Sequence, residues 1–232
     1  MDLIVTGLAD AVARLARLDA DLLQAAEASL TTSGMATLLS VITGVPIGTA
    51  IGLGRFRGRT LLLALANTGM GFPPVVVGLA VAVVVWRSGP LGELSWSCTR
   101  QAMILAQYIL AAPTVVGLTA VAVQSVDPGL RLQLLSLGAT RRQAMWIFVQ
   151  EARLPILTAA MAGFGAVISE IGASLMVGCN IRGDTRILTT AIALETSKGE
   201  FGAAFGLAFI LLVLIFAVNA VTTWAQQRQR PS

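Results

Sequence analysis

The chain has 232 residues, of which 56% are hydrophobic and 12% charged, and its mean hydropathy is +0.80. Soluble domains carry about 25% charged residues, so the composition excludes a soluble globule and indicates a membrane protein. There is no histidine, which removes the commonest general base and metal ligand. The two cysteines, Cys98 and Cys179, have no CxxC spacing. A disulfide between them stays open, but nothing in the sequence argues for it.

The excess of basic over acidic residues is better explained by membrane topology than by a nucleic-acid partner. Lysine and arginine total 16 against 12 acidic residues, and the pI is about 10.0. The basic residues stand between apolar runs and form no patch with interleaved aromatics. We therefore expect the charges to orient the chain in membrane lipid, and we expect no nucleic-acid binding.

Five stretches are apolar enough to cross a membrane, since a spanning helix needs about 20 mostly apolar residues. The predicted spans are residues 29–53, 60–86, 98–124, 155–178 and 201–224, in one transmembrane domain over residues 29–227. A connection over residues 125–154 separates the third span from the fourth. Residues 1–28 are too charged to span, and their leucines at helical spacing predict an interfacial amphipathic helix. Those leucines are Leu8, Leu15, Leu18 and Leu22. The sequence thus predicts an all-α membrane protein.

The basic residues in the connections predict the orientation, with the two termini on opposite sides. One side carries Arg55, Arg57, Arg59, Arg131, Arg141, Arg142, Arg153, Arg228 and Arg230. The other side carries Arg14, Arg17, Arg87, Arg100, Arg182, Arg186 and Lys198, together with the acidic residues of the amino-terminal segment. The first side is assigned to the cytoplasm, so the amino terminus lies outside and the carboxyl terminus inside.

Prolines are predicted to interrupt three spans, at Pro46, at Pro113 and at the pair Pro73-Pro74. Lipid cannot satisfy the freed backbone carbonyls, so each break must face protein or water. A packing kink explains any one proline, but three broken spans favour a transporter or channel over an anchor. Four-residue spacing of glycines in the first span predicts a close-packed helix face. These glycines are Gly44, Gly48 and Gly52.

Glu170 is the one acid deep inside a predicted span, and an intramembrane carboxylate is a functional candidate by default. On a continuous helix it shares a small, weakly polar face with Gly163, Ala166, Ala173 and Ser174. A bare carboxylate would repel an anionic cargo, so a structural or gating role is favoured over cargo contact. The candidate pathway or gate residues are Pro73, Pro74, Ser169 and Glu170.

Two polar segments are candidate contact surfaces. Residues 178–186 offer guanidinium, amide and hydroxyl donors suited to an oxyanion, although a solvated loop uses the same residue types. The candidate contacts with an anion or a partner protein there are Asn180, Arg182, Gly183, Thr185 and Arg186. Residues 137–146 predict a short amphipathic helix opening at Thr140, which would present Met145, Trp146 and Phe148 for docking or lie against the membrane interface. No phosphate-binding loop, catalytic constellation or metal-ligand cluster is present in the sequence, so catalysis by this chain is not expected.

Residues 138–142 and Leu154-Pro155 resemble the cytoplasmic signature of the permease subunits of type I bacterial ABC importers. That signature is Glu-Ala-Ala, a glycine four residues later, and Ile-x-Leu-Pro further on. The glutamate position falls on Leu132 and the expected proline position on Glu151, so a glutamate contact with the ATPase is not carried over.

Three segments, residues 54–59, 67–79 and 87–92, are similar to the molybdate/tungstate permeases. Residues 168–172, 180–183 and 188–199 are similar to the tungstate-specific branch of that group, and Cys179 stands where that branch is expected to have glycine.

The resemblance implies a homodimeric permease in the prokaryotic inner membrane, with one pathway between the two copies. It would take tungstate or a related oxyanion from an extracytoplasmic binding protein. Two ATP-binding subunits, which hold ATP and magnesium, would dock on a coupling helix. The residues implied in that docking are Gly138, Ala139, Thr140, Arg141, Arg142, Met145 and Trp146.

Three alternatives stay open. The nearest is a permease for molybdate or sulfate. A second is a gradient-driven secondary transporter that uses Glu170 as its proton or ion carrier. A third is a membrane scaffold without transport, in which the prolines and Glu170 serve packing only.

Overall fold

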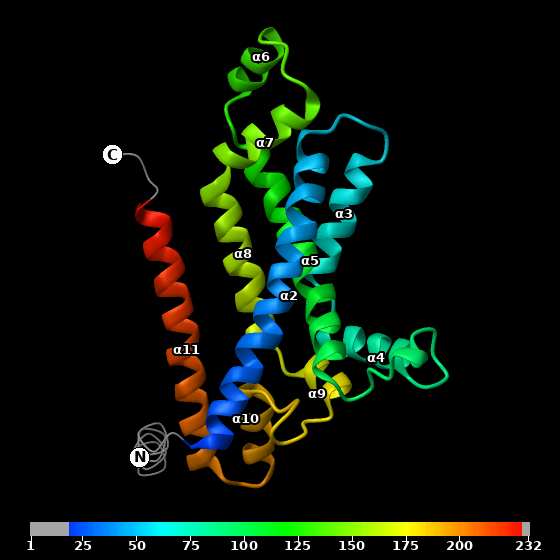
Figure 1. The fold of residues 1–232 in the computed structure, drawn as a ribbon, viewed down its shortest axis with the longest axis vertical. Helices are drawn as coiled ribbons and strands as arrows, with labels where there is room; N and C mark the ends of the chain where they lie inside the picture. Colours follow the sequence, from blue (N-terminus) through cyan, green and yellow to red (C-terminus); the bar gives the residue numbers. More distant parts are fainter. Residues whose placement is uncertain (1–18, 229–232) are drawn as a thin grey trace.

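The computed structural model describes residues 19–228, and every regular element in that range is helical. The long helices α2 (Ala20–Leu53), α5 (Arg100–Gln124) and α8 (Arg153–Ile168) lie side by side along the long axis, with α3 (Arg59–Met70) against α5 (Figure 1). The last helix, α11 (Phe201–Arg228), runs along the edge of this bundle (Figure 1). The predicted all-α fold class is confirmed.

Short elements close the two ends of the bundle. At one end project α6 (Pro128–Ser136) and α7 (Arg141–Glu151) (Figure 1). We call it the arginine-rich end, because Arg141 and Arg142 open α7, while Arg55 and Arg57 lie in the connection from α2 to α3, and Arg55 and Arg141 line one cavity there. The opposite end holds α4 (Pro74–Val85), α9 (Gly172–Gly178) and α10 (Leu188–Ser197), with a 3-10 turn at Gly92–Leu94 in the connection that follows α4. We call it the disulfide end, after a bond between Cys98 and Cys179.

Three of the described helices, α2, α5 and α11, are each long and apolar enough to cross a membrane. Two bent pairs raise the number to as many as five: α3 with α4 at 99°, and α7 with α8 at 72°. α5 lies within two residues of the predicted bounds 98–124, and α11 begins at Phe201, as predicted. The predicted continuous span 155–178 is wrong, because α8 ends at Ile168 and α9 begins only at Gly172.

The first described helix begins nine residues before the predicted span. Asp19 caps it, since its Oδ1 accepts hydrogen bonds from the backbone N–H of Asp21 at 3.0 Å and of Leu22 at 3.2 Å. At about 1.5 Å per residue, 34 residues extend about 51 Å, well beyond the roughly 30 Å hydrocarbon core of a bilayer. The charged first turns of α2 therefore extend the helix beyond its apolar part. Leu8, Leu15 and Leu18 of the predicted amphipathic helix lie outside the described residues.

Of the three predicted proline breaks, one is found in the structure and two are not. The pair Pro73-Pro74 produces the sharp break between α3 and α4, with Pro74 at the first position of α4, where no backbone donor is needed. Pro46 and Pro113 do not interrupt their helices, because α2 and α5 continue through them. At Pro113 the ring packs against Gly69 of α3, where an added Cβ would lie 2.7 Å from the ring carbons. Protein, not lipid, thus covers that proline.

Glycines bring α2 into close contact with α5. A Cβ added at Gly44 would lie 3.0 Å from Val115, and one at Gly48 would lie 2.5 Å from the carbonyl oxygen of Val116. Gly52 packs in the same way on Val123. Because successive glycines of α2 meet successively later residues of α5, the two helices run parallel. The predicted close-packed glycine face is confirmed.

Candidate functional site

Glu170 lies at the break between α8 and α9 and caps α9. Its Oε1 accepts a hydrogen bond from the backbone N–H of Gly172 at 2.8 Å, and its Oε2 accepts one from Ala173 at 2.9 Å. The carboxylate therefore satisfies two backbone donors at the positive end of a helix, where no carbonyl of the helix can accept from them. The predicted face shared with Gly163, Ala166, Ala173 and Ser174 is wrong, because the helix stops before Glu170. The adjacent Ser169 is exposed and donates to the carbonyl of Gly165 at 2.8 Å.

The break at Glu170 contacts the break at Pro73-Pro74. A Cβ added at Gly172 would lie 2.6 Å from Cγ2 of Val75, the residue that follows Pro74. Further along, a Cβ at Gly78 of α4 would lie 2.7 Å from Cα of Ala173. Two short helices that each follow a break thus start against each other and pack together. The structure thus brings the four predicted pathway residues, Pro73, Pro74, Ser169 and Glu170, to one region toward the disulfide end.

α10 is joined to the same region. The hydroxyl of Thr189, in its first turn, donates to the carbonyl oxygen of Glu170 at 3.0 Å. The backbone N–H of Leu188 donates to the hydroxyl of Ser29 on α2 at 2.8 Å. A displacement of the Glu170 backbone would therefore displace α10 and, through the hydrogen bond to Ser29, α2.

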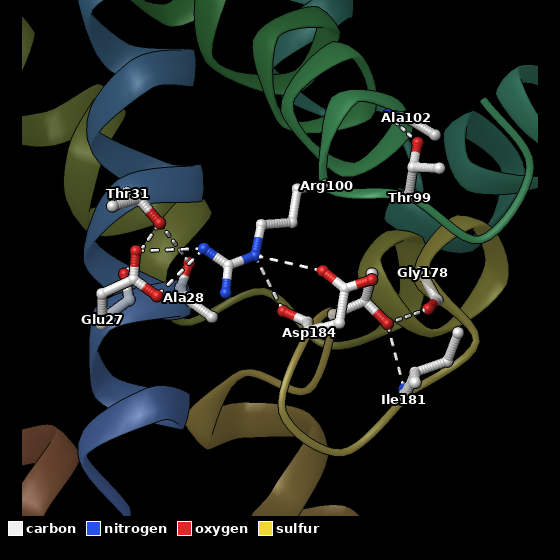
Figure 2. A network of polar contacts seen from close by, with 10 residues as sticks. Glu27, Ala28, Thr31, Thr99, Arg100, Ala102, Gly178, Ile181 and Asp184 are labelled. Carbon is white, nitrogen blue, oxygen red and sulfur yellow. Dashed lines mark hydrogen bonds and ion pairs between the residues drawn. The ribbon is translucent and has the colours of Figure 1, made fainter.

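The predicted anion-contact residues form a segment that is held by ion pairs. Arg100, in the first turn of α5, lies between Glu27 of α2 and Asp184 (Figure 2). Its Nη1 donates to both carboxylate oxygens of Glu27 at 3.0 and 2.9 Å, and its Nε donates to the carbonyl of Asp184 at 2.8 Å. Sequence reasoning missed this network, whose members are 73 and 84 positions apart.

Arg182 and Arg186 have partners within the protein. Nε of Arg182 donates to Oδ1 of Asp21 at 2.8 Å, and Nη2 pairs with the second carboxylate oxygen. The hydrogen bond to Asp21 raises the pKa of Arg182 above its ordinary value, so this exposed guanidinium stays charged. Arg186 donates to Oδ1 of Asn180 at 3.2 Å and to its carbonyl at 3.3 Å.

The segment is also closed on itself. The buried hydroxyl of Thr185 accepts from the N–H of Ile181 at 3.0 Å and donates to the carbonyl of Gly178. Gly183 has φ +81°, a conformation that glycine adopts without strain. Cys179, with φ +60°, occupies a left-handed position at the end of α9, which gives a physical reason for the glycine expected there. It is bonded to Cys98, a pairing that no pattern in the sequence predicts.

We expect the two members of the Arg182–Asp21 pair to respond differently to substitution if the guanidinium contacts a partner. Arg182→Ala removes the guanidinium, whereas Asp21→Asn removes the charge of its ionic partner and leaves the guanidinium in place. An ion pair this exposed adds little to stability, so both variants should assemble normally. With the binding protein that the resemblance implies, uptake measured against its concentration should show weaker delivery for Arg182→Ala and near-normal delivery for Asp21→Asn. Equal, unaltered uptake in both would remove Arg182 from the contact surface.

At the arginine-rich end, the predicted helix opening at Thr140 is confirmed. Thr140 caps α7 reciprocally with Gln143: the Thr140 N–H donates to Oε1 at 2.8 Å, and the Gln143 N–H donates to Oγ1 at 3.4 Å. Gly138 turns the chain between α6 and α7 with φ +69°. Trp146 is 64% exposed, but Phe148 is buried, so the prediction that Phe148 is presented for docking is wrong.

A cavity of about 640 Å³ lies between this helix pair and the end of α2. Its lining is mostly apolar, with Arg55 and Arg141 among the lining residues. The half-buried side chain of Met145 faces this cavity, and Ala139 contributes to its wall. The predicted docking residues therefore divide: Trp146 projects outward with Leu132 and Leu137, while Ala139, Arg141 and Met145 surround a hollow. Within residues 19–228, no group of three His, Cys, Asp or Glu side chains is placed to hold a metal ion.

A helical bundle with membrane-length helices, broken helices at one end and a projecting helix pair at the other defines a multi-pass membrane permease. The sequence profile of the family described as "Binding-protein-dependent transport system inner membrane component" matches residues 44–231, and the chain belongs to that family. It is thus the permease subunit of an ABC transporter.

Named relatives and a solved structure agree with this membership. A "Probable anion ABC transporter permease protein" of Haloferax volcanii is 44% identical over 83% of this chain and 85% of its own length. The "Tungstate uptake system permease protein TupB" of Peptoclostridium acidaminophilum is 34% identical over 95% of this chain and 97% of its own. The MetNI methionine ABC transporter, in an inward-facing crystal form, has the same fold, with a TM-score of 0.75 at 17% identity over 93% of this chain and 99% of the matched chain.

Proposed function

We propose that this permease imports tungstate or a closely related oxyanion, as one half of a homodimer driven by two ATP-binding subunits. The observation that carries the substrate is the similarity to a tungstate uptake permease over nearly the whole chain. The binding protein would deliver the anion at the disulfide end. The ATP-binding subunits, with their ATP and magnesium, would dock at the arginine-rich end in the cytoplasm, which the positive charge there supports.

The chain of rigid elements between the two ends supports a mechanism. α7 ends at Glu151 and α8 begins at Arg153, with a bend of 72° between them. α8 then leads to the Glu170 break, beyond which α9 packs on α4. A displacement of the docked helix pair by closure of the ATPase dimer would therefore be transmitted along α8 to both broken helices. Rocking of these elements would open the pathway alternately to the two sides.

The Glu170 geometry supports the ATP-driven mechanism over a gradient-driven carrier. A carrier carboxylate must bind and release a proton or an ion during each cycle. Both carboxylate oxygens of Glu170 instead accept backbone hydrogen bonds that hold the start of α9. We therefore assign Glu170 the role of a positioning residue at the gate.

We expect substitutions at Gly138 to impair coupling in proportion to the strain that they introduce. Nothing lies within 4 Å of a Cβ added there, so its φ of +69° alone decides the cost. Gly138→Val is expected to distort the turn and to uncouple ATP hydrolysis from transport, because a left-handed conformation costs a branched residue at least about 1–2 kcal/mol. Gly138→Asn should retain most coupling, since asparagine tolerates that conformation. Substrate-stimulated ATPase activity and uptake, measured together, would check this; equal loss in both variants would indicate a steric contact instead.

The experiment that tests the function is uptake into proteoliposomes that hold this chain, its ATP-binding subunit and its binding protein. Labelled tungstate and molybdate are compared with and without internal ATP. ATP-dependent tungstate uptake that resists excess molybdate is the expected result. Preference for molybdate or sulfate would keep the ATP-driven mechanism and overturn the substrate. Uptake that persists without ATP and collapses with the membrane gradient would favour the carrier mechanism through Glu170.

A further inference from the structure

The Cys98–Cys179 disulfide joins two connections that lie 81 residues apart in the chain, with their Cα atoms 5.1 Å apart. Cys98 lies two residues before α5, and Cys179 directly follows α9. Cys179 is exposed and Cys98 is half-buried, so water-soluble reagents can reach the bond. These are the only cysteines in the chain, and the bond is its one possible internal disulfide.

The disulfide fixes the far end of a very short helix. α9 has seven residues; Glu170 caps its start, and Cys179 anchors its end to α5. Between these points α9 packs on α4, the helix that follows the Pro73-Pro74 break. The cap at Glu170, the packing of α9 on α4 and the bond to Cys98 together set the position of one broken helix relative to the other.

The ion pairs on residues 179–187 are weak by comparison, and the buried hydroxyl of Thr185 closes the segment only on itself. Glu27, Asp184 and Arg182 have side chains that are 52%, 56% and 68% exposed, and exposed ion pairs contribute little to stability. The network around Arg100 can orient the segment but cannot replace a covalent bond. Loss of the disulfide should therefore free the end of α9 while leaving the helical bundle assembled.

We propose that this disulfide is a redox-sensitive fastening that keeps α9 and residues 179–187 in the transport-competent position. Reduction on the disulfide side breaks the S–S bond with two electrons and two protons, gives two thiols and slows transport; a thiol reductant becomes a disulfide, and a phosphine becomes its oxide with oxygen from water. Exchange with a small-molecule disulfide, which is itself reduced to two thiols, re-forms the bond and restores transport. The proposed orientation places this end outside the cytoplasm, where disulfides persist. The inference rests on the proposed function only for its transport measurement.

Three variants separate the bond from the residues that form it. Cys98→Ser and Cys179→Ser remove the bond. Cys179→Gly also removes it, but supplies the residue best suited to φ +60° at that position, so any backbone strain is relieved. If the bond matters, all three variants should lose uptake by a similar factor, several-fold or more. If only the backbone conformation matters, Cys179→Gly should transport like the unmodified protein.

The test uses the complete transporter in proteoliposomes and a membrane-impermeant phosphine added outside. In each copy of this chain, we expect neither cysteine to react with maleimide before reduction and both to react afterwards. Uptake by the unmodified protein should fall on reduction to the level of Cys98→Ser, while Cys98→Ser itself should not respond. Free thiols in the never-reduced protein, or equal inhibition of Cys98→Ser, would overturn the proposal.

A second readout keeps this inference separate from the proposed function. The melting temperature of the purified transporter should fall on reduction in the unmodified protein and stay constant in Cys98→Ser. If tungstate and molybdate are not imported at all, this shift and the thiol titration still test the fastening. A melting temperature that does not respond to reduction would overturn it, whatever the substrate.

Discussion

Replacing Gly48 by alanine is expected to destabilise the permease. The added methyl would lie 2.5 Å from the carbonyl oxygen of Val116 and 2.8 Å from Cβ of Thr119, closer than nonbonded atoms approach. Neither atom is the end of a flexible side chain, so α2 and α5 must move apart. Overpacking of this kind costs about 1–3 kcal/mol, or roughly 2–12 °C in melting temperature for a domain of this size. Thermal unfolding in detergent would measure the fall.

Gly34 supplies the matched control on the same helix. No heavy atom lies within 4 Å of a Cβ added there, and glycine inside a helix is about 0.5–1 kcal/mol less favourable than alanine. Gly34→Ala should therefore leave stability unchanged or increase it slightly. If Gly48→Ala melted at the same temperature as Gly34→Ala, the close approach of α2 and α5 would not hold.

Hydrophobic pattern and local capping signals were sufficient to predict much of the bundle. The apolar run before Gln124 and the start of α11 at Phe201 agree with the structure to within two residues. The predicted helix opening at Thr140 agrees with the structure, where Thr140 and Gln143 form a capping box, a local signature of a helix start. Asp19 is also a favoured N-cap residue, but the charged first turns of α2 are not apolar, so the predicted span begins nine residues after the helix does.

The break after Ile168 could not be predicted in the same way. No proline lies at this break. The break is instead followed by Glu170, whose side chain reaches forward along the chain and caps the next helix. The network around Arg100 and the disulfide depend on residues more than 70 positions apart, and no local pattern reports such distances. The glycine that the family resemblance leads one to expect at position 179 fits the left-handed turn that the structure shows at Cys179, but the sequence alone did not predict that turn.

Glu170→Ala is expected to lower transport strongly while leaving ATP dependence intact. The substitution leaves the N–H groups of Gly172 and Ala173 without their acceptors, and Ala173 is fully buried. An unsatisfied buried donor costs about 1–3 kcal/mol, and each 1.4 kcal/mol shifts a two-state equilibrium about tenfold. The start of α9 should therefore leave its position against Val75 in a large share of molecules. Uptake should fall about tenfold or more, with less effect on basal ATPase activity.

Glu170→Gln distinguishes positioning from carrier chemistry. The glutamine carbonyl can still accept one of the two hydrogen bonds, so a positioning role predicts uptake between that of the unmodified protein and that of Glu170→Ala. A carrier role predicts that glutamine, which cannot bind or release a proton, is as inactive as alanine. A scaffold role predicts no loss with glutamine at all. The rank order of the three proteins in ATP-driven uptake thus decides among the roles. Because Cys179 holds the other end of α9, the loss of uptake in Glu170→Ala should deepen further when the disulfide is reduced.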